Sequence, residues 1–249
     1  MDFSKIAYMH NGTSYQDSFI YPKIRDQTTP VVLVIPDYHG ATSYALEEAR
    51  WLSNLGYIGY CVDIYGENAM PRSSEDAAKM IIPLFDDREY TLARTQAALE
   101  QACSLDGVDA GRSAVVGFSS GGLFALDMAR RINGLRAVAS IWGVALPWEL
   151  KPSPMISPNV NGANLLLIHG TKDIFNPMES NISLIRELDG ANCDYQMILL
   201  GGKKHAFSLK KEDNLEILSG EEPQALLYDE LADNRAHSYL EHFLSESLA

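Results

Sequence analysis

The residues with the clearest chemical potential lie in segment 114–123, which reads AVVGFSSGGL and places the pattern Gly-x-Ser-x-Gly around Ser119. A serine on a sharp turn between a strand and a helix exposes its hydroxyl, and the two glycines leave room for that turn. The pattern predicts a nucleophilic Ser119, with the backbone N–H of Ser120 facing a developing oxyanion. The glycines fit neither a dinucleotide-binding fingerprint nor a phosphate-binding loop, because Ser119 replaces the middle glycine and no lysine follows Gly122.

A serine nucleophile needs a base, and the base needs an acid that orients it. Where this motif occurs, the chain order is Ser, then Asp or Glu, then His. Asp173 follows the apolar run at 165–168, and His205 follows a strand expected over 194–200. The carboxyl ends of parallel strands meet at one edge of a sheet, so these side chains can converge on Ser119. We therefore predict a triad of Ser119, His205 and Asp173.

The second oxyanion donor is expected from the loop PDYHG at 36–40. We assign it to the backbone N–H of Tyr38, and we expect the neighbouring Asp37 and His39 to line the pocket. No metal site is predicted, because His237 and His242 are five residues apart on a helical pattern and do not share one face. The three cysteines are widely spaced, which indicates neither a disulfide framework nor a zinc knuckle.

The elements that must position these residues alternate along the chain. From residue 31 onward, short apolar runs alternate with helical patterns, which predicts β/α units and a mostly parallel, twisted sheet with helices on both faces. Strands are expected over 31–35, 57–63, 113–117, 136–142, 163–169 and 194–200. Helices are expected between Thr42 and Gly56 and over 74–85, 87–104, 122–132 and 224–244, with one more after a capping box at 176–179.

The first 30 residues predict a small hairpin that extends the sheet, because Asn11 and Gly12 separate two alternating stretches. With no repeat or linker evident, we expect one domain over 1–249. The pocket walls are expected from 64–86 and 143–161. Aromatic residues in or beside these stretches suggest an apolar pocket: Tyr65, Phe85, Trp142 and Trp148.

The charge balance limits the partners. The chain has 20 Lys and Arg against 33 Asp and Glu, a formal net charge of −13, which disfavours nucleic acid and anionic membrane surfaces. No apolar run approaches the roughly 18 residues of a membrane span, and the N-terminus lacks a basic-then-apolar signal. We expect a cytoplasmic protein that acts on a small molecule.

Together these segments resemble the dienelactone hydrolase family of α/β-hydrolases over about residues 31–244. The resemblance rests on VIPDYHG at 34–40, VDIYG at 62–66, GFSSGG at 117–122, HGTKD at 169–173 with Pro177, KHAF at 204–207, and a last helix over 228–243. It implies the α/β-hydrolase fold and a hydrolase that acts on an ester or lactone bond without a cofactor.

The chain also departs from the family's namesake enzyme, which has a cysteine nucleophile where Ser119 stands and a glutamate where Asp37 stands. Two arginines hold the substrate carboxylate in that enzyme, and the matching positions here are Glu67 and Leu209, which cannot clamp an anion. Glu67 is accordingly expected at the pocket, and Arg72 or Arg88 is an alternative source of a cation. The comparison favours a neutral ester over anionic dienelactone.

The predicted activity is a serine hydrolase that cleaves a small carboxylic ester or lactone through an acyl-enzyme. Two alternatives remain open at this point. One is a peptidase of the prolyl-oligopeptidase type, which uses the same triad. The other is a hydrolase-fold protein that binds or senses a ligand without turnover.

Overall fold

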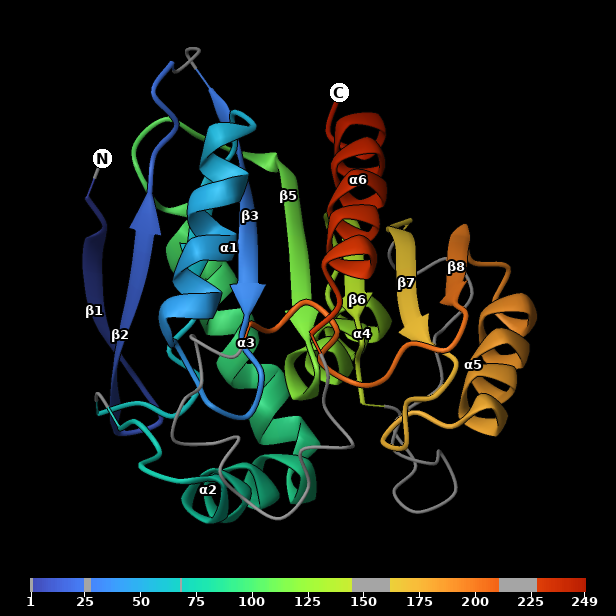
Figure 1. Ribbon diagram of the computed structural model, residues 1–249. Coiled ribbons are helices and arrows are strands. Elements are labelled where there is room, and N and C mark those ends of the chain that lie inside the picture. The colour runs from blue at the N-terminus through green and yellow to red at the C-terminus, as the bar shows by residue number, and fades with distance from the viewer. Residues whose placement is uncertain (1, 25–27, 68, 145–161, 211–227) are drawn as a thin grey trace.

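The computed structural model describes residues 2–24, 28–67, 69–144, 162–210 and 228–249. Eight strands form one sheet in the order β1-β2-β4-β3-β5-β6-β7-β8 (Figure 1). From β4 to β8 every neighbouring pair runs parallel, whereas β1 with β2 and β2 with β4 are antiparallel. The mostly parallel sheet that the sequence predicted is confirmed.

The N-terminal hairpin consists of β1 (Ser4–His10) and β2 (Thr13–Ile20). Asn11 and Gly12 join the strands with φ angles of 48° and 81°, the positive values that a two-residue hairpin turn requires. Because β2 also pairs with β4, the hairpin extends the sheet as expected.

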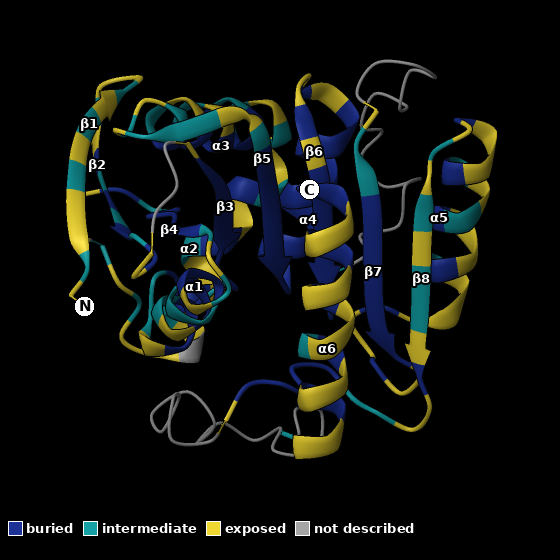
Figure 2. Ribbon diagram, turned by 90° about the horizontal axis from the view of Figure 1, so that it is seen from above, coloured by how far each residue is buried: buried dark blue, intermediate teal, exposed yellow. Residues whose placement is uncertain are grey.

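The central strands are buried on both faces, as their continuous apolar runs predict. They are β3 (Thr29–Ile35), β4 (Ile58–Cys61), β5 (Val108–Phe118), β6 (Leu135–Ile141) and β7 (Asn164–Gly170). Strand β8 (Tyr195–Leu200) forms the edge of the sheet and is only partly buried. In the view from above, the middle strands are almost entirely buried, while the outer surfaces of the helices are exposed (Figure 2).

The helices divide into two layers. They are α1 (Ser43–Asn54), α2 (Ser74–Asp86), α3 (Arg88–Cys103), α4 (Ser120–Arg131), α5 (Met178–Gly190) and α6 (Glu230–Ser247). Alternate residues of β3 point to opposite faces: Val32 and Val34 pack in the core under α1 and α6, whereas Leu33 and Ile35 pack in the core under α3, α4 and α5. The structure thus contains one sheet between two helical layers.

Helix α2 is placed differently from the other helices. It lies beyond the carboxyl ends of the strands, where the arrowheads of β3, β5 and β7 end (Figure 1). Ile81 and Leu84 anchor it to the core of the α3 and α4 layer. One of its faces therefore lies across the edge of the sheet at which the chemistry was predicted.

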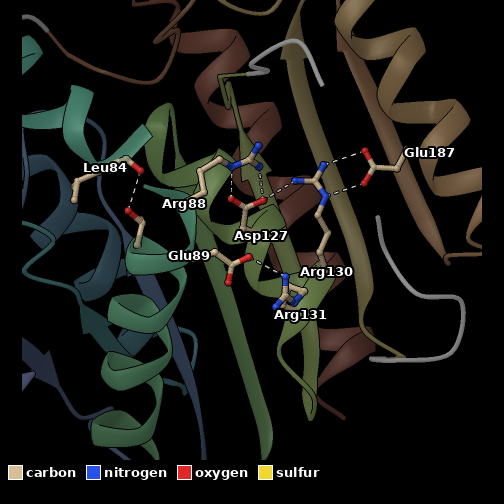
Figure 3. Close-up of polar contacts among 8 residues, drawn as sticks. Leu84, Arg88, Glu89, Asp127, Arg130, Arg131 and Glu187 are labelled. Carbon is tan, nitrogen blue, oxygen red and sulfur yellow. Dashed lines mark hydrogen bonds and ion pairs between the residues drawn. The ribbon is translucent and has the colours of Figure 1, made fainter. Parts of the chain in front are cut away.

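An ion-pair network holds α3, α4 and α5 together (Figure 3). Arg88 donates to both carboxylate oxygens of Asp127, and Arg130 donates to Asp127 at 2.7 Å. Arg130 also binds Glu187 of α5 through two hydrogen bonds of 2.7 and 3.0 Å. Because α4 starts directly after Ser119, the network fixes the helix that presents the serine.

Three expectations need correction or fall outside the described residues. The capping box at 176–179 is wrong: α5 has Pro177 as its N-cap and no side-chain cap, since the Asn176 amide is used elsewhere. Residues 145–161, with Trp148, and the first residues of the predicted last helix lie outside the described residues. Within the described ranges, none of the helices is long and apolar enough to cross a membrane.

Candidate active site

Ser119 stands at a strained turn between β5 and α4, with φ 51° and ψ −118°. The turn brings backbone segments so close that a Cβ atom at Gly117 would lie 2.0 Å from the carbonyl oxygen of Gly121. A Cβ atom at Gly121 would lie 2.2 Å from the carbonyl oxygen of Ile35. The two glycines of the motif are therefore required sterically, as the sequence pattern implies.

The structure brings the three predicted triad residues together. The Oγ atom of Ser119 lies 2.8 Å from Nε2 of His205, and Nδ1 of His205 lies 2.7 Å from Oδ2 of Asp173. Each of the three residues is no more than 5% exposed. This is the arrangement in which a base can take the serine proton while an acid orients the base.

The Asp173 carboxylate is fixed from both sides. Its Oδ1 accepts hydrogen bonds from the backbone N–H groups of Phe175 at 2.8 Å and Asn176 at 3.2 Å. Its Oδ2 is then directed at His205. The loop after β7 thus sets the acid before any substrate binds.

A buried polar cluster supports that loop. The Asn176 amide contacts Nδ1 of His169 at 2.6 Å and Oδ1 of Asn181 at 3.0 Å. Burial lowers the pKa of His169 to about 4. The nearby His205 lowers this pKa further, whereas the Asp173 carboxylate raises it. His169 is therefore neutral at pH 7, and its Nδ1 can accept the amide N–H. The sequence placed Asn176 as a helix cap, and no local signal shows that it pairs with His169.

The two residues predicted to supply oxyanion donors, Ser120 and Tyr38, line the same cavity as Ser119. Ser120 is the first residue of α4, and the first N–H groups of a helix have no intrahelical acceptor. Tyr38 lines the cavity from the loop after β3, and its carbonyl accepts a 2.5 Å hydrogen bond from the hydroxyl of Tyr65. That bond links the loop after β3 to the loop after β4.

Asp37 and His39 also line the cavity, as expected, and are at most 3% exposed. Oδ1 of Asp37 accepts the backbone N–H of His39 at 2.7 Å and lies 2.9 Å from its Nδ1. Glu67 differs from the prediction. It is exposed, and it lies outside the cavity because its backbone N–H is bonded to the carbonyl of Ser14 on β2.

The cavity has a volume of about 390 Å³. Its polar lining consists of the residues already described. The other residues that line it are Ala78, Ile81, Ile82, Phe85, Trp142, Val144, Phe175, Ala206 and Leu209. The predicted apolar pocket thus includes Phe85 and Trp142, whereas Tyr65 serves the neighbouring loop. The contribution of Phe175 was not foreseen, since its position beside His205 depends on the loop after β7.

Two aromatic rings hold the His205 imidazole. Trp142 meets it edge-to-face with ring centroids 5.2 Å apart, and Phe175 lies at 4.9 Å. Nε1 of Trp142 donates to Oγ of Ser208 at 2.7 Å, and Ser208 also bonds the hydroxyl of Tyr44 at 2.8 Å. The Trp142 ring that packs on His205 is therefore itself oriented by a buried hydrogen bond.

Neither alternative cation reaches the cavity. Arg88 is bound to Asp127, and Arg72 has a side chain that is 91% exposed and paired with Asp76. No lysine or arginine lines the cavity in the described part of the chain. The same described residues contain no cluster of three or more His, Cys, Asp or Glu side chains suited to a metal ion.

A profile of the dienelactone hydrolase family matches residues 19–248. The chain belongs to this family. It is therefore a carboxylic ester hydrolase with the α/β-hydrolase fold, and the resemblance identified from the sequence is confirmed.

Individual relatives agree with this assignment. A probable 2-oxo-3-(5-oxofuran-2-ylidene)propanoate lactonase of Bradyrhizobium sp is 25% identical over 183 residues, 72% of this chain and 73% of that protein. Carboxymethylenebutenolidase 1 of Cupriavidus pinatubonensis is 29% identical, covering 66% of this chain and 70% of that protein. The crystal structure of P91, a dienelactone hydrolase-like promiscuous phosphotriesterase from metagenomic libraries, superimposes with a TM-score of 0.89 at 25% identity, covering 100% of this chain and 99% of that one.

Proposed function

We propose that this family member is a serine hydrolase that cleaves a small carboxylic ester or lactone through an acyl-enzyme. The observation that carries the proposal is the continuous hydrogen-bonded chain from Ser119 through His205 to Asp173, which opens on an apolar cavity. Such a chain activates a hydroxyl that is a weak nucleophile at its free pKa.

In the first half of the reaction, Nε2 of His205 takes the proton of the Ser119 hydroxyl as its oxygen attacks the substrate carbonyl carbon. Asp173 holds the imidazole in the required tautomer and stabilises the imidazolium that forms. The N–H groups of Ser120 and Tyr38 stabilise the oxyanion of the tetrahedral intermediate. The intermediate collapses when His205 returns the proton to the departing alkoxide, which leaves as an alcohol.

In the second half, His205 takes a proton from a water molecule, whose oxygen attacks the acyl carbonyl of the Ser119 ester. Collapse of the second tetrahedral intermediate breaks the bond to Oγ, and His205 returns the proton to the serine. The products are a carboxylic acid and the alcohol, and the enzyme is regenerated without a cofactor. In a lactone the acid and the alcohol are parts of one molecule.

The Bradyrhizobium relative is named a probable lactonase, and a lactone is a cyclic ester that the same steps open. This chain lacks a cation among the described residues that line the cavity. A neutral ester therefore suits the site better than the carboxylate-bearing substrate that the resemblance would suggest.

Variant kinetics test the proposal. With 4-nitrophenyl acetate as substrate, Ser119→Ala should lower kcat by roughly 10⁴–10⁶, and Asp173→Asn should lower it less than Ser119→Ala does. Ser183→Ala, on the exposed surface of α5, is the matched control and should retain wild-type kcat. If folded Ser119→Ala protein keeps more than a few per cent of the activity, the assignment of the nucleophile is wrong.

A further inference from the structure

We propose that helix α2 forms the acyl-binding wall of the site and selects esters whose acyl group is uncharged and apolar, of about hexanoyl size. This inference rests on the proposed function and deepens it, because it names the substrate class and the element that sets it.

Four side chains of α2 line the cavity, namely Ala78, Ile81, Ile82 and Phe85. Their spacing of three, four and seven residues places them on one face of the helix. This apolar stripe reaches from the core to solvent. Phe85 packs on Phe124 with ring centroids 5.7 Å apart, and Ile81 is buried at 5% exposure. Ile82 forms the open end of the stripe and is 53% exposed. An apolar face left open at one end in this way can cover an extended apolar group.

The other apolar residues that line the cavity come from distant parts of the chain. Leu209, four residues after His205, is buried and lines the cavity, as do Val144 and the ring of Phe175. The acyl group stays bonded to Ser119 through both halves of the reaction, whereas the alcohol must leave after the first. We therefore assign the part of the cavity that is lined by α2 and Leu209, called the acyl arm below, to the acyl group of the substrate.

The charges of the lining select against anions. Among the described residues that line the cavity, the ionisable side chains are those of Asp37, Tyr38, His39 and His205, and His205 is committed to the triad. Asp37 is the one carboxylate among these lining residues, and it is paired with His39. No lysine or arginine stands among these described residues, so a substrate carboxylate would lose its hydration here without a cationic partner. Burial of a methyl group, in contrast, is favourable.

The size of the cavity limits the acyl chain. At about 30 Å³ for each water-sized group, a cavity of about 390 Å³ holds roughly a dozen non-hydrogen atoms. A buried methylene can raise kcat/KM by up to about fourfold. We expect kcat/KM for 4-nitrophenyl esters to rise at least about tenfold from acetate to hexanoate and to stop rising with longer chains.

Charge selection is tested with a matched pair of esters, 4-nitrophenyl hexanoate and 4-nitrophenyl hydrogen adipate. Their acyl chains differ only at the far end, which is a methyl group in the hexanoate and a carboxylate in the adipate. Wild-type enzyme should favour the hexanoate at least about 100-fold in kcat/KM. Ile82→Arg places a cation at the open end of the stripe and should reduce this ratio at least about tenfold. Ile82→Met keeps the apolar wall and should keep the ratio.

Size selection is tested with Ala78→Trp, which fills the acyl arm, against Lys79→Trp. Lys79 is the next residue of α2, has a side chain that is 68% exposed and lies outside the cavity. Ala78→Trp should lower the ratio of hexanoate to acetate kcat/KM at least about tenfold, whereas Lys79→Trp should leave the ratio at its wild-type value.

The outcomes separate the two levels of the proposal. Acetate hydrolysis with a flat chain-length profile, or equal rates for hexanoate and adipate, overturns the assignment of α2 and leaves the serine hydrolase in place. Equal ratios of hexanoate to acetate kcat/KM for Ala78→Trp and Lys79→Trp would also overturn the assignment of α2 and leave the serine hydrolase in place. If the wild-type enzyme hydrolyses none of these esters and Ser119 takes no fluorophosphonate, the proposed function fails and this inference fails with it.

Discussion

At the scale of single residues, backbone strain is concentrated at the candidate active site. Six non-glycine residues in the described part of the chain have positive φ, and three of them line the cavity: Ser119 at 51°, Trp142 at 39° and Ala206 at 54°. Such residues persist only where their surroundings hold them, and they are enriched at functional sites. The strain at Ser119 follows from its turn, which depends on the glycines on either side.

Gly121→Ala should therefore destabilise the protein strongly. The new Cβ would lie 2.2 Å from the carbonyl oxygen of Ile35 and 2.4 Å from that of Pro36, and these backbone atoms cannot move freely. We expect a loss of about 3 kcal/mol or more in the free energy of unfolding, measured with urea. Gly190→Ala is the control, since its Cβ would meet nothing within 4 Å. Equal stabilities for the two variants would contradict the steric account of the motif.

His169 should make the protein sensitive to mild acid. Its pKa is about 4 in the native state and near 6.5 when unfolded, so between these values the unfolded state binds more protons. The stability that depends on neutral His169 is fully present above pH 6.5 and is lost as pH falls toward 4, by a total on the order of 3 kcal/mol. Urea unfolding at pH 7 and pH 4.5 should show a smaller difference for His169→Asn than for the wild type. An equal difference would show that His169 is not the titrating group.

At the scale of elements, the Asp127 carboxylate is the centre of the network that joins α3 to α4 and α5. Asp127 is 6% exposed, and it neutralises both Arg88 and Arg130. Asp127→Asn should cost about 3 kcal/mol of stability, because it leaves two buried guanidinium groups without their common partner. The measurement is urea unfolding at pH 7.

Glu89→Gln serves as the control for that prediction. The Glu89 to Arg131 pair in the same region has side chains that are 67% and 38% exposed (Figure 3). Exposed pairs contribute little, so this variant should change stability by less than about 0.5 kcal/mol. If Glu89→Gln costs as much as Asp127→Asn, burial is not what gives the network its strength.

The elements differ in how far the sequence predicts them. Strands such as β3 and β7 follow from apolar runs, and the turn at Asn11 follows from its backbone preference, because these signals are local. The cap of α5 was predicted wrongly for a physical reason: a buried imidazole at His169 competes for the Asn176 amide, and the partner lies on another element. A local pattern cannot show such competition.

At the scale of the whole molecule, the predicted triad residues meet because three loops follow strands that end at one edge of a parallel sheet. Chain order and strand ends were enough to predict that convergence. The shape of the cavity was not predictable in the same way, because its walls combine α2 with Phe175 and Leu209, which lie in loops far along the chain. Glu67 is a second example. Its matching position in the family's namesake enzyme predicted a place at the pocket, but the turn after β4 places it on the outer surface.

The measurement that tests the central claim most directly is mass spectrometry of the protein after reaction with a fluorophosphonate, with Ser119→Ala treated in parallel. The reagent phosphonylates a serine that an adjacent base activates, and it leaves ordinary serines unmodified. We predict one adduct per chain, mapped by peptide analysis to Ser119 and absent from the variant. An adduct on another serine, or none on folded wild-type protein, would contradict the proposal that Ser119, His205 and Asp173 form a working triad.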